Sequence, residues 1–298
     1  MVSRPEDESP RTVPVQRLRP GDHSFVAFTD VEARWQVLTA YTRTGLARRE
    51  KVLLVLDPSD LSDDDAVARM DGAGNYVEAA RASGQLVITR STSLYLPDGR
   101  FDKDRQLAVA APIIEDVQRE GWHGLRAASD MTWALRPGVD LDEVIDFEVS
   151  IGPIVTIPGV TGICWYDRRR FSSYWVAAAR EVHPVQVMER LDAVSITRTP
   201  SGWRIAGSAE SSSREEFTEA LSAALKQPDT GSPFHFELDM TDLCFMEAHC
   251  AWQLISLAAA LPESSKVVVH CGPLLDLVLR GLGSDTVSQL ELNVAEEP

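Results

Sequence analysis

Several polar and aromatic side chains lie near the ends of the apolar runs that this sequence is expected to use as strands. Asp57 directly follows the run Lys51–Leu56, and Asp130 closely follows the run Gly124–Ala128. Open α/β sheets bind ligands beyond the carboxyl ends of their strands, in pockets with apolar walls and a few convergent polar groups. We therefore expect a small molecule to bind at that edge. The candidate ligand-binding residues are His23, Asp57, Arg126, Asp130, Trp133, Tyr166 and Asp167.

Some of these residues also have an ordinary structural role open to them. His23, placed by the sequence at the mouth of the first strand, either senses a small effector through hydrogen bonding or protonation, or packs against the preceding loop. Arg126 and Asp130 are expected to pair with each other. Asp167 and the run 168–170 either bind an anionic ligand or form a solvated loop. Tyr95 and Phe101 flank a Pro-Asp-Gly turn, where they either cover the pocket or pack on the turn.

Local motifs predict neither a metal site nor a catalytic site. The four cysteines have no CxxC spacing, and the His-Cys pairs at 249–250 and 270–271 would supply metal ligands only if the fold brought them together. Buried structural cysteines are the simpler interpretation. No Ser-His-Asp or Cys-His motif is present, and Asp239 and Asp242 are interpreted as turn residues rather than a catalytic carboxylate pair. No cofactor is expected.

The loop after the first expected strand is unsuited to a nucleotide triphosphate. A phosphate-binding loop needs glycines that let its amides approach the phosphates and a lysine that contacts them. The sequence Thr29–Arg34, TDVEAR, has neither and carries two carboxylates. ATP hydrolysis at this position is therefore not expected.

Alternating strand and helix patterns predict a doubly wound parallel sheet, followed by a smaller α/β unit. Apolar runs at 24–28, 51–56, 86–89, 124–128 and 162–166 alternate with helical segments. Residues 1–13 are expected to be a disordered tail, residues 14–187 one domain and residues 190–298 a second domain. Lys226–Pro233 is expected to be a polar linker.

The composition is that of a globular protein with a strong acidic charge. The net charge of the 298 residues is −16, and from Leu191 onward 6 Lys and Arg face 16 Asp and Glu, a net charge of −10. This charge disfavours nucleic acid and favours a basic protein partner. No apolar run reaches the about 20 residues that span a membrane, and no secretory signal is seen. A cytoplasmic location is expected.

The N-terminal unit resembles the MEDS domain, the sensory domain of a dichloromethane-metabolism repressor and of methanogen and methylotroph regulators. The resemblance rests on Gly21-Asp22-His23, on Gly45-Leu46-Ala47 with Glu50, on Gly124-Leu125-Arg126 with 129–133, and on 163–171 leading to His183-Pro184. It implies a RecA- or KaiC-like core without a phosphate loop. It also implies an actinobacterial protein, because actinobacterial relatives fuse this domain to a STAS domain.

Residues 191–298 resemble a STAS domain, the fold of bacterial anti-sigma-factor antagonists. The match rests on Trp203–Gly207 with the helix 213–225, on 239–243 with the following helix, and on Lys266–His270 with 273–282. Phospho-regulated members carry Asp-Ser-Ser-Gly before the central helix, where this chain has Glu247-Ala248-His249-Cys250. His249 replaces the serine, so phosphorylation of a serine is not available there. The candidate partner-binding residues are Asp242, Glu247, His249, Cys250 and Gln253.

Together these features predict a non-enzymatic signalling regulator. The MEDS-like domain would sense a small molecule or partner, and the STAS-like domain would bind an anti-sigma factor or a similar regulatory protein. No nucleic acid or membrane partner is expected, and a homodimer is a further candidate assembly. One alternative is an enzyme on a degenerate RecA-like scaffold with an unorthodox nucleotide site, and another is an interaction scaffold without a ligand pocket.

Overall fold

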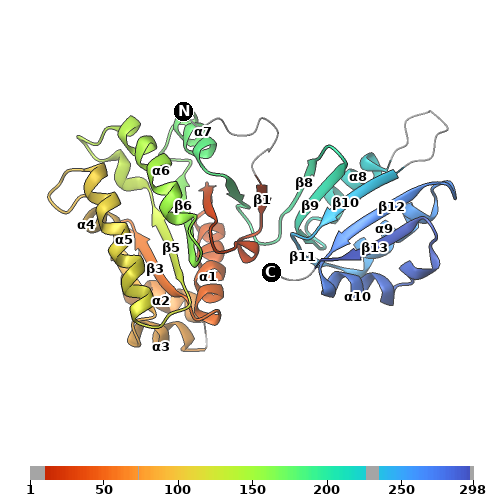
Figure 1. Cartoon of the computed structure of the whole chain (residues 1–298), viewed down its shortest axis with the longest axis horizontal. Coiled ribbons are helices and arrows are strands. Elements are labelled where there is room, and N and C mark those ends of the chain that lie inside the picture. Colours follow the sequence, from red (N-terminus) through yellow and green to blue (C-terminus); the bar gives the residue numbers. More distant parts are fainter. Residues whose placement is uncertain (1–10, 73, 226–234, 296–298) are drawn as a thin grey trace. The chain divides into compact units, whose positions relative to one another are not determined.

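The computed structural model describes residues 11–72, 74–225 and 235–295, which form two compact units (Figure 1). The first unit contains Leu18–Glu189, and the second contains Arg190–Pro298. Residues 1–10 of the predicted tail and the predicted linker 226–233 lie outside the described residues. Residues 11–13 are not part of a disordered tail, because they form strand β1 with Val13 buried at the sheet edge.

A seven-stranded sheet forms the centre of the first unit, in the order β1-β7-β2-β6-β5-β3-β4. The pairings from β7 through β4 are all parallel. Near-continuous apolar runs such as KVLLVL suit strands that are covered on both faces. The strands are β1 (Arg11–Val13), β2 (His23–Phe28), β3 (Lys51–Leu56), β4 (Leu86–Arg90), β5 (Leu125–Asp130), β6 (Val160–Asp167) and β7 (Val185–Val187).

Helices cover both faces of this sheet. Gly45 of α1 lies against Arg126 and Val52, whereas residues of α5 and α6 face Leu53 and Ala127, which project from the opposite side of the same strands. The helices are α1 (Val31–Ala47), α2 (Asp63–Asp71), α3 (Tyr76–Ala82), α4 (Ser91–Tyr95), α5 (Lys103–Arg119), α6 (Leu141–Val155) and α7 (Ser173–Val182), with short 3-10 turns η1 (Val15–Arg17) and η2 (Thr132–Leu135).

Side-chain hydroxyl and carboxylate caps set the starts of several helices. Asp30, Ser62, Asp102 and Ser172 each accept a hydrogen bond from a backbone amide in the first turn of the helix that follows. Asp140 does the same for α6, so this helix begins at Leu141. The predicted α/β architecture with a parallel sheet is confirmed.

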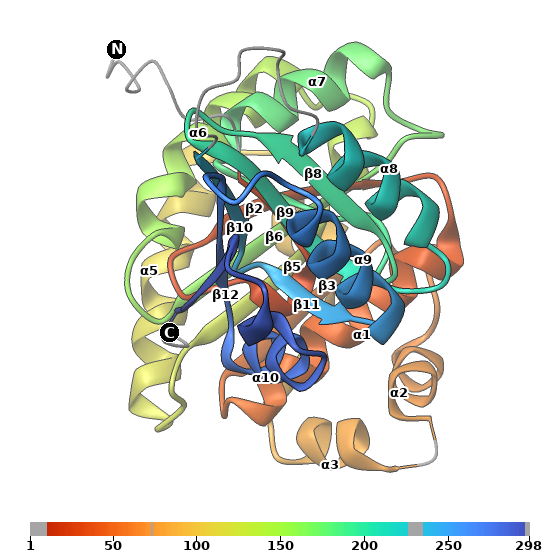
Figure 2. The same ribbon diagram turned by 90° about the vertical axis from the view of Figure 1, so that its right-hand side faces the viewer.

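The second unit has its own six-stranded sheet, in the order β11-β9-β10-β12-β13, with β8 antiparallel to β9 and the other pairings parallel. Figure 2 shows α8 and α9 side by side, and α9 also packs against α10. The elements are β8 (Val194–Arg198), β9 (Gly202–Ala209), α8 (Arg214–Ala224), β10 (His235–Met240), β11 (Leu243–Met246), α9 (Ala248–Ala259), β12 (Lys266–Cys271), α10 (Pro273–Gly281), η3 (Ser284–Thr286) and β13 (Leu290–Val294).

In the described part of the chain no helix has the length and apolarity needed to cross a membrane.

Candidate functional site

The carboxyl edge of the first sheet holds a polar recess with a volume of about 320 Å³. Asp57 at the end of β3 and Asp130 at the end of β5 approach each other through the Thr132 hydroxyl, which lies within hydrogen-bond distance of both carboxylates. The Asp130 carboxylate also accepts a hydrogen bond from Trp165 Nε1 at 2.9 Å. Four of the predicted residues, Asp57, Asp130, Tyr166 and Asp167, line this recess.

The charges in the recess are largely satisfied by the protein itself. Arg34 binds Asp60 at 2.8 Å. Arg169 donates two hydrogen bonds to the Asp167 carboxylate, one to each oxygen, and Arg170 lies 3.6 Å from Asp57. Burial favours the neutral form of Asp57, but hydrogen bonds from Ser59 and Thr132 outweigh this and lower its pKa to about 2. Burial raises the pKa of Asp130.

His23 does not lie at this edge. It is the first residue of β2, at the amino end of the strand, and its side chain is 2% exposed. The sequence pattern correctly placed His23 at one end of the first strand. That end is the amino end, whereas ligands were expected at the carboxyl end. The expectation that His23 shares a pocket with Asp57 and Asp130 is therefore wrong.

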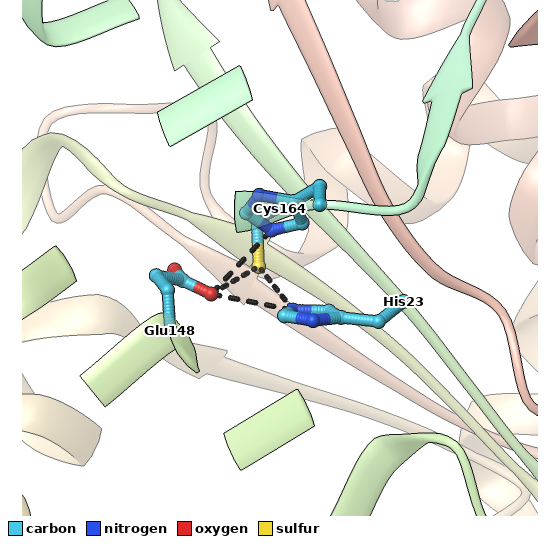
Figure 3. Close-up of side chains that lie close together, drawn as sticks. His23, Glu148 and Cys164 are labelled. Atoms are coloured by element: carbon cyan, nitrogen blue, oxygen red, sulfur yellow. Dashed lines mark hydrogen bonds and ion pairs between the residues drawn. The ribbon is translucent and has the colours of Figure 1, made fainter. Parts of the chain in front are cut away.

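His23 instead lies in a buried cluster with Glu148 and Cys164 (Figure 3), and His183 is its fourth member. Glu148 Oε2 lies 3.2 Å from His23 Nε2, 3.4 Å from His183 Nε2 and 3.7 Å from Cys164 Sγ. The four residues come from β2, α6, β6 and the residue that ends α7. Predicted Tyr166 also reaches this cluster, because its hydroxyl donates to Glu148 Oε1 at 3.3 Å.

The cluster has strongly perturbed electrostatics. Burial of Glu148 favours its neutral form, but His183 and His23 outweigh this effect and lower its pKa. Burial lowers the pKa of His23, and the neighbouring His183 adds to this effect. Burial also raises the pKa of Cys164, with Glu148 adding a repulsive charge. The structure thus favours an ionised carboxylate on Glu148 beside a neutral Cys164 thiol and a neutral His23 imidazole.

An apolar cavity of about 120 Å³ adjoins the cluster. It lies between the sheet and helices α5 and α6, which contribute Ile113, Ile114, Phe147 and Ile151 to its wall. His23, Glu148 and Cys164 also border the cavity, so its apolar walls have one polar end. This combination of an apolar wall and a few polar groups is typical of a small-molecule site.

The two remaining predicted ligand-binding residues have structural positions. Arg126 is fully buried and its Nε donates to Glu50 Oε2 at 2.6 Å, so the expected pairing with Asp130 is wrong. Trp133 is also fully buried and stacks on Tyr95 at a centroid distance of 4.5 Å. Phe101 packs on the same indole at 4.8 Å. Tyr95 and Phe101 therefore act as core aromatics and do not cover the recess.

The predicted partner-binding residues of the second unit separate into exposed and buried sets. His249 is exposed, and Gln253 Nε2 lies 3.4 Å from His249 Nε2 one turn along α9. Glu247 pairs with Arg214 through both carboxylate oxygens. Cys250 and Asp242 are buried, so in this structure neither presents a surface to a partner.

Sequence reasoning missed Glu148, Cys164 and His183 as members of one site. His183 and Cys164 stood in segments singled out for other reasons, and Glu148 lies in a helix whose pattern carries no motif. The nearest residues of this group are 16 positions apart along the chain, 148 and 164, so no local spacing signals their meeting.

Comparisons with known proteins assign the first unit. A family model described as MEDS, the methanogen/methylotroph, DcmR sensory domain, matches residues 22–184. The flagellar accessory protein FlaH from Methanocaldococcus jannaschii is a similar solved structure, at 12% identity and a TM-score of 0.40, covering 64% of this chain and 80% of that chain. No curated protein matches the chain. Since the MEDS model covers more than half of the residues, the chain belongs to the MEDS sensory-domain family.

Proposed function

We propose that this protein is a non-enzymatic signalling regulator whose MEDS domain binds a small, mainly apolar molecule. The observation that carries the proposal is the cavity between the sheet and helices α5 and α6. An engineered protein cavity of about 150 Å³ with apolar walls binds benzene. The present cavity, at about 120 Å³, suits a molecule of that size or smaller, with a polar group directed at His23, Glu148 or Cys164.

Helix α5 is suited to report the occupancy of this cavity. Of its 17 residues only Gln106 and Val117 are buried, while Ile113 and Ile114 border the cavity. Helices with few buried contacts open at low free-energy cost. A ligand in the cavity would bind more tightly when α5 lies on the sheet than when α5 is detached from it. Ligand binding would therefore shift the population toward the state with α5 on the sheet, and this shift would be the signal.

We infer that residues 190–298 form a STAS-like module that binds a basic regulatory protein, such as an anti-sigma factor. Trp252 of α9 is 55% exposed, and His249 lies one turn before it on the same helix. Exposed tryptophans often dominate the energy of protein interfaces. The net charge of −10 from Leu191 onward favours a basic partner.

The site where a nucleotide enzyme would hold phosphates is already taken by a side chain. Asp30 caps α1 by accepting a hydrogen bond from Ala33 N at 2.7 Å. A carboxylate at a helix N-terminus uses the same amides and dipole that would bind a phosphate. This supports a non-enzymatic role.

Thermal unfolding of the full chain with benzene, dichloromethane or butanol tests the ligand proposal. A free ligand concentration of about 100 times the Kd would add about 2.7 kcal/mol to the free energy of unfolding. Ala127→Leu should abolish the shift, because residue 127 lines the cavity, whereas Ala111→Leu on the exposed side of α5 should retain it. Equal shifts in both variants would refute binding in this cavity.

Affinity capture from the protein's host tests the partner proposal. Trp252→Ala should weaken capture of an anti-sigma factor by about tenfold or more, as expected for an interface hot spot. Leu277→Ala, which removes a more exposed side chain from α10, should leave it unchanged. Equal capture by both variants would place the interface elsewhere.

The recess at the carboxyl edge favours a second candidate, an enzyme with an unorthodox nucleotide site. Its volume of about 320 Å³ would admit a polar ligand, which would have to displace the carboxylates that now pair with its arginines. ATP turnover by the full chain that Asp57→Ala abolishes would support this candidate. Absence of turnover, together with cavity binding, would favour the sensory function.

A further inference from the structure

Four potential metal ligands converge in the buried interior of the first unit. Their ligand atoms, one each from His23, Glu148, Cys164 and His183, all lie within 4.8 Å of one another. Figure 3 shows how the first three of these side chains point toward one another. His23, Glu148 and His183 are at most 2% exposed. Two imidazoles, a carboxylate and a thiol form a donor set that divalent transition metals accept.

Four of the six distances between these ligand atoms are close to the edges of a tetrahedron around zinc, and the other two are at most 4.8 Å. Zinc–ligand bonds of about 2.0–2.3 Å at tetrahedral angles give edges of about 3.4 Å between nitrogen and oxygen and about 3.6 Å when sulfur is included. The two nitrogen–oxygen edges are 3.2 and 3.4 Å. The edges from Cys164 Sγ are 3.7 Å to Glu148 Oε2 and 3.9 Å to His23 Nε2.

The orientation of the His183 ring places its acceptor nitrogen, Nε2, opposite a second acceptor. Its Nδ1 lies 2.7 Å from the Ala179 carbonyl oxygen, so Nδ1 carries the proton that it donates. Its Nε2 makes no hydrogen bond with any described residue, although it faces Glu148 Oε2 at 3.4 Å. In the neutral imidazole, two acceptors would face each other. Either a further proton or a cation must lie between them.

Charge balance favours a divalent ion at this position. A carboxylate and a thiolate supply two negative charges, which a divalent cation neutralises while both imidazoles stay neutral. A net-neutral site avoids the cost of an uncompensated charge in the protein interior. Binding would displace the thiol proton that Cys164 now directs at Glu148.

The surroundings also resemble a metal site beyond its direct ligands. The Ala179 carbonyl accepts from the His183 ring nitrogen that points away from the cluster, and Tyr166 donates to the second oxygen of Glu148. Such hydrogen bonds orient metal ligands in known proteins. The cavity that borders His23, Glu148 and Cys164 leads to the site.

We propose that His23, Glu148, Cys164 and His183 bind one divalent transition metal ion, with zinc as the best match to this donor set and geometry. Four protein ligands describe a closed tetrahedral site that links β2, β6, α6 and the end of α7. The site does not depend on the small molecule proposed above.

Metal content and cobalt spectroscopy of the full chain test this proposal. Purified protein, stripped with chelator and reloaded, should bind one zinc per chain. Cobalt(II) should give visible bands of tetrahedral intensity and a thiolate-to-cobalt charge-transfer band. Cys164→Ser should remove the charge-transfer band, whereas Cys250→Ser, at a buried cysteine of the second unit, should retain it.

Tyr166→Phe provides a milder variant that keeps all four ligands. It should weaken zinc binding by about 10–100-fold, as other changes next to metal ligands do. X-ray absorption at the zinc edge of the unmodified protein should show one sulfur among four ligands, which keeps the test valid if Cys164→Ser does not fold. A protein that binds neither zinc nor cobalt, or binds cobalt without sulfur, overturns the proposal. Neither readout requires the small molecule, so failure here leaves the sensory proposal intact.

Discussion

Removing Glu50 should strongly destabilise the MEDS domain, because it leaves Arg126 buried without a carboxylate. The Arg126 side chain is 0% exposed and that of Glu50 is 8% exposed, with 2.6 Å between Arg126 Nε and Glu50 Oε2. Arg126 also lies 4.7 Å from the centroid of the Tyr41 ring, and both of its terminal nitrogens lack a hydrogen-bond partner among the described residues. No other described carboxylate therefore compensates its charge through a hydrogen bond.

The magnitude follows from the burial of this pair. Removing one partner of a buried ion pair costs about 3–5 kcal/mol. For a domain of this size each kcal/mol lowers Tm by about 2–4 °C, so Glu50→Ala should lower Tm by about 10 °C. Five of the seven tryptophans lie within residues 22–184, so fluorescence mainly reports unfolding of this domain.

Two controls separate the buried charge from general effects of substitution. Glu120→Ala breaks a pair with neighbouring Lys51, but Glu120 is 45% exposed and the cost should stay below about 1 kcal/mol. The double variant Glu50→Leu with Arg126→Met removes both charges and should recover much of the lost stability. Equal destabilisation by Glu50→Ala and Glu120→Ala would refute the reasoning.

Three further predictions concern the same domain. Gly45→Ala should lower the free energy of unfolding by about 1–3 kcal/mol in urea titrations, since a Cβ there would lie 2.7 Å from Arg126 Cδ, and an unchanged midpoint would contradict this contact. Asp30→Ala should cost about 1 kcal/mol by loss of the cap on α1, while Asp30→Asn should retain most of it. The lowered pKa of Asp57 means that its carboxylate stabilises the fold above a pH of about 4 and that this contribution is lost as pH falls through about 2. Asp57→Asn should therefore flatten the fall of Tm over that range, and parallel pH profiles for both proteins would count against it.

The buried cluster shows where prediction from sequence ends. Cys164 was visible as a residue of an apolar strand and His23 as the residue just before one. Their neighbours Glu148 and His183 approach them only because α6 and α7 pack on the same sheet face. Likewise, Arg126 was expected to pair with Asp130, four positions away in the same strand segment. The alternation of side chains along a strand gives the face on which Arg126 lies, but not its partner. Only the packing of α1 on that face decides that Arg126 meets Glu50.

The sequence by itself determined the elements of this protein. Apolar runs such as KVLLVL predict buried parallel strands, and their alternation with helical segments predicts an α/β fold. The sequence Thr29–Arg34 lacks the glycines and the lysine of a phosphate-binding loop. These properties depend on neighbouring residues, which the sequence presents directly. The tertiary structure alone decided which side chains meet, because residues as distant as His23 and His183 approach only after the strands take their order in the sheet.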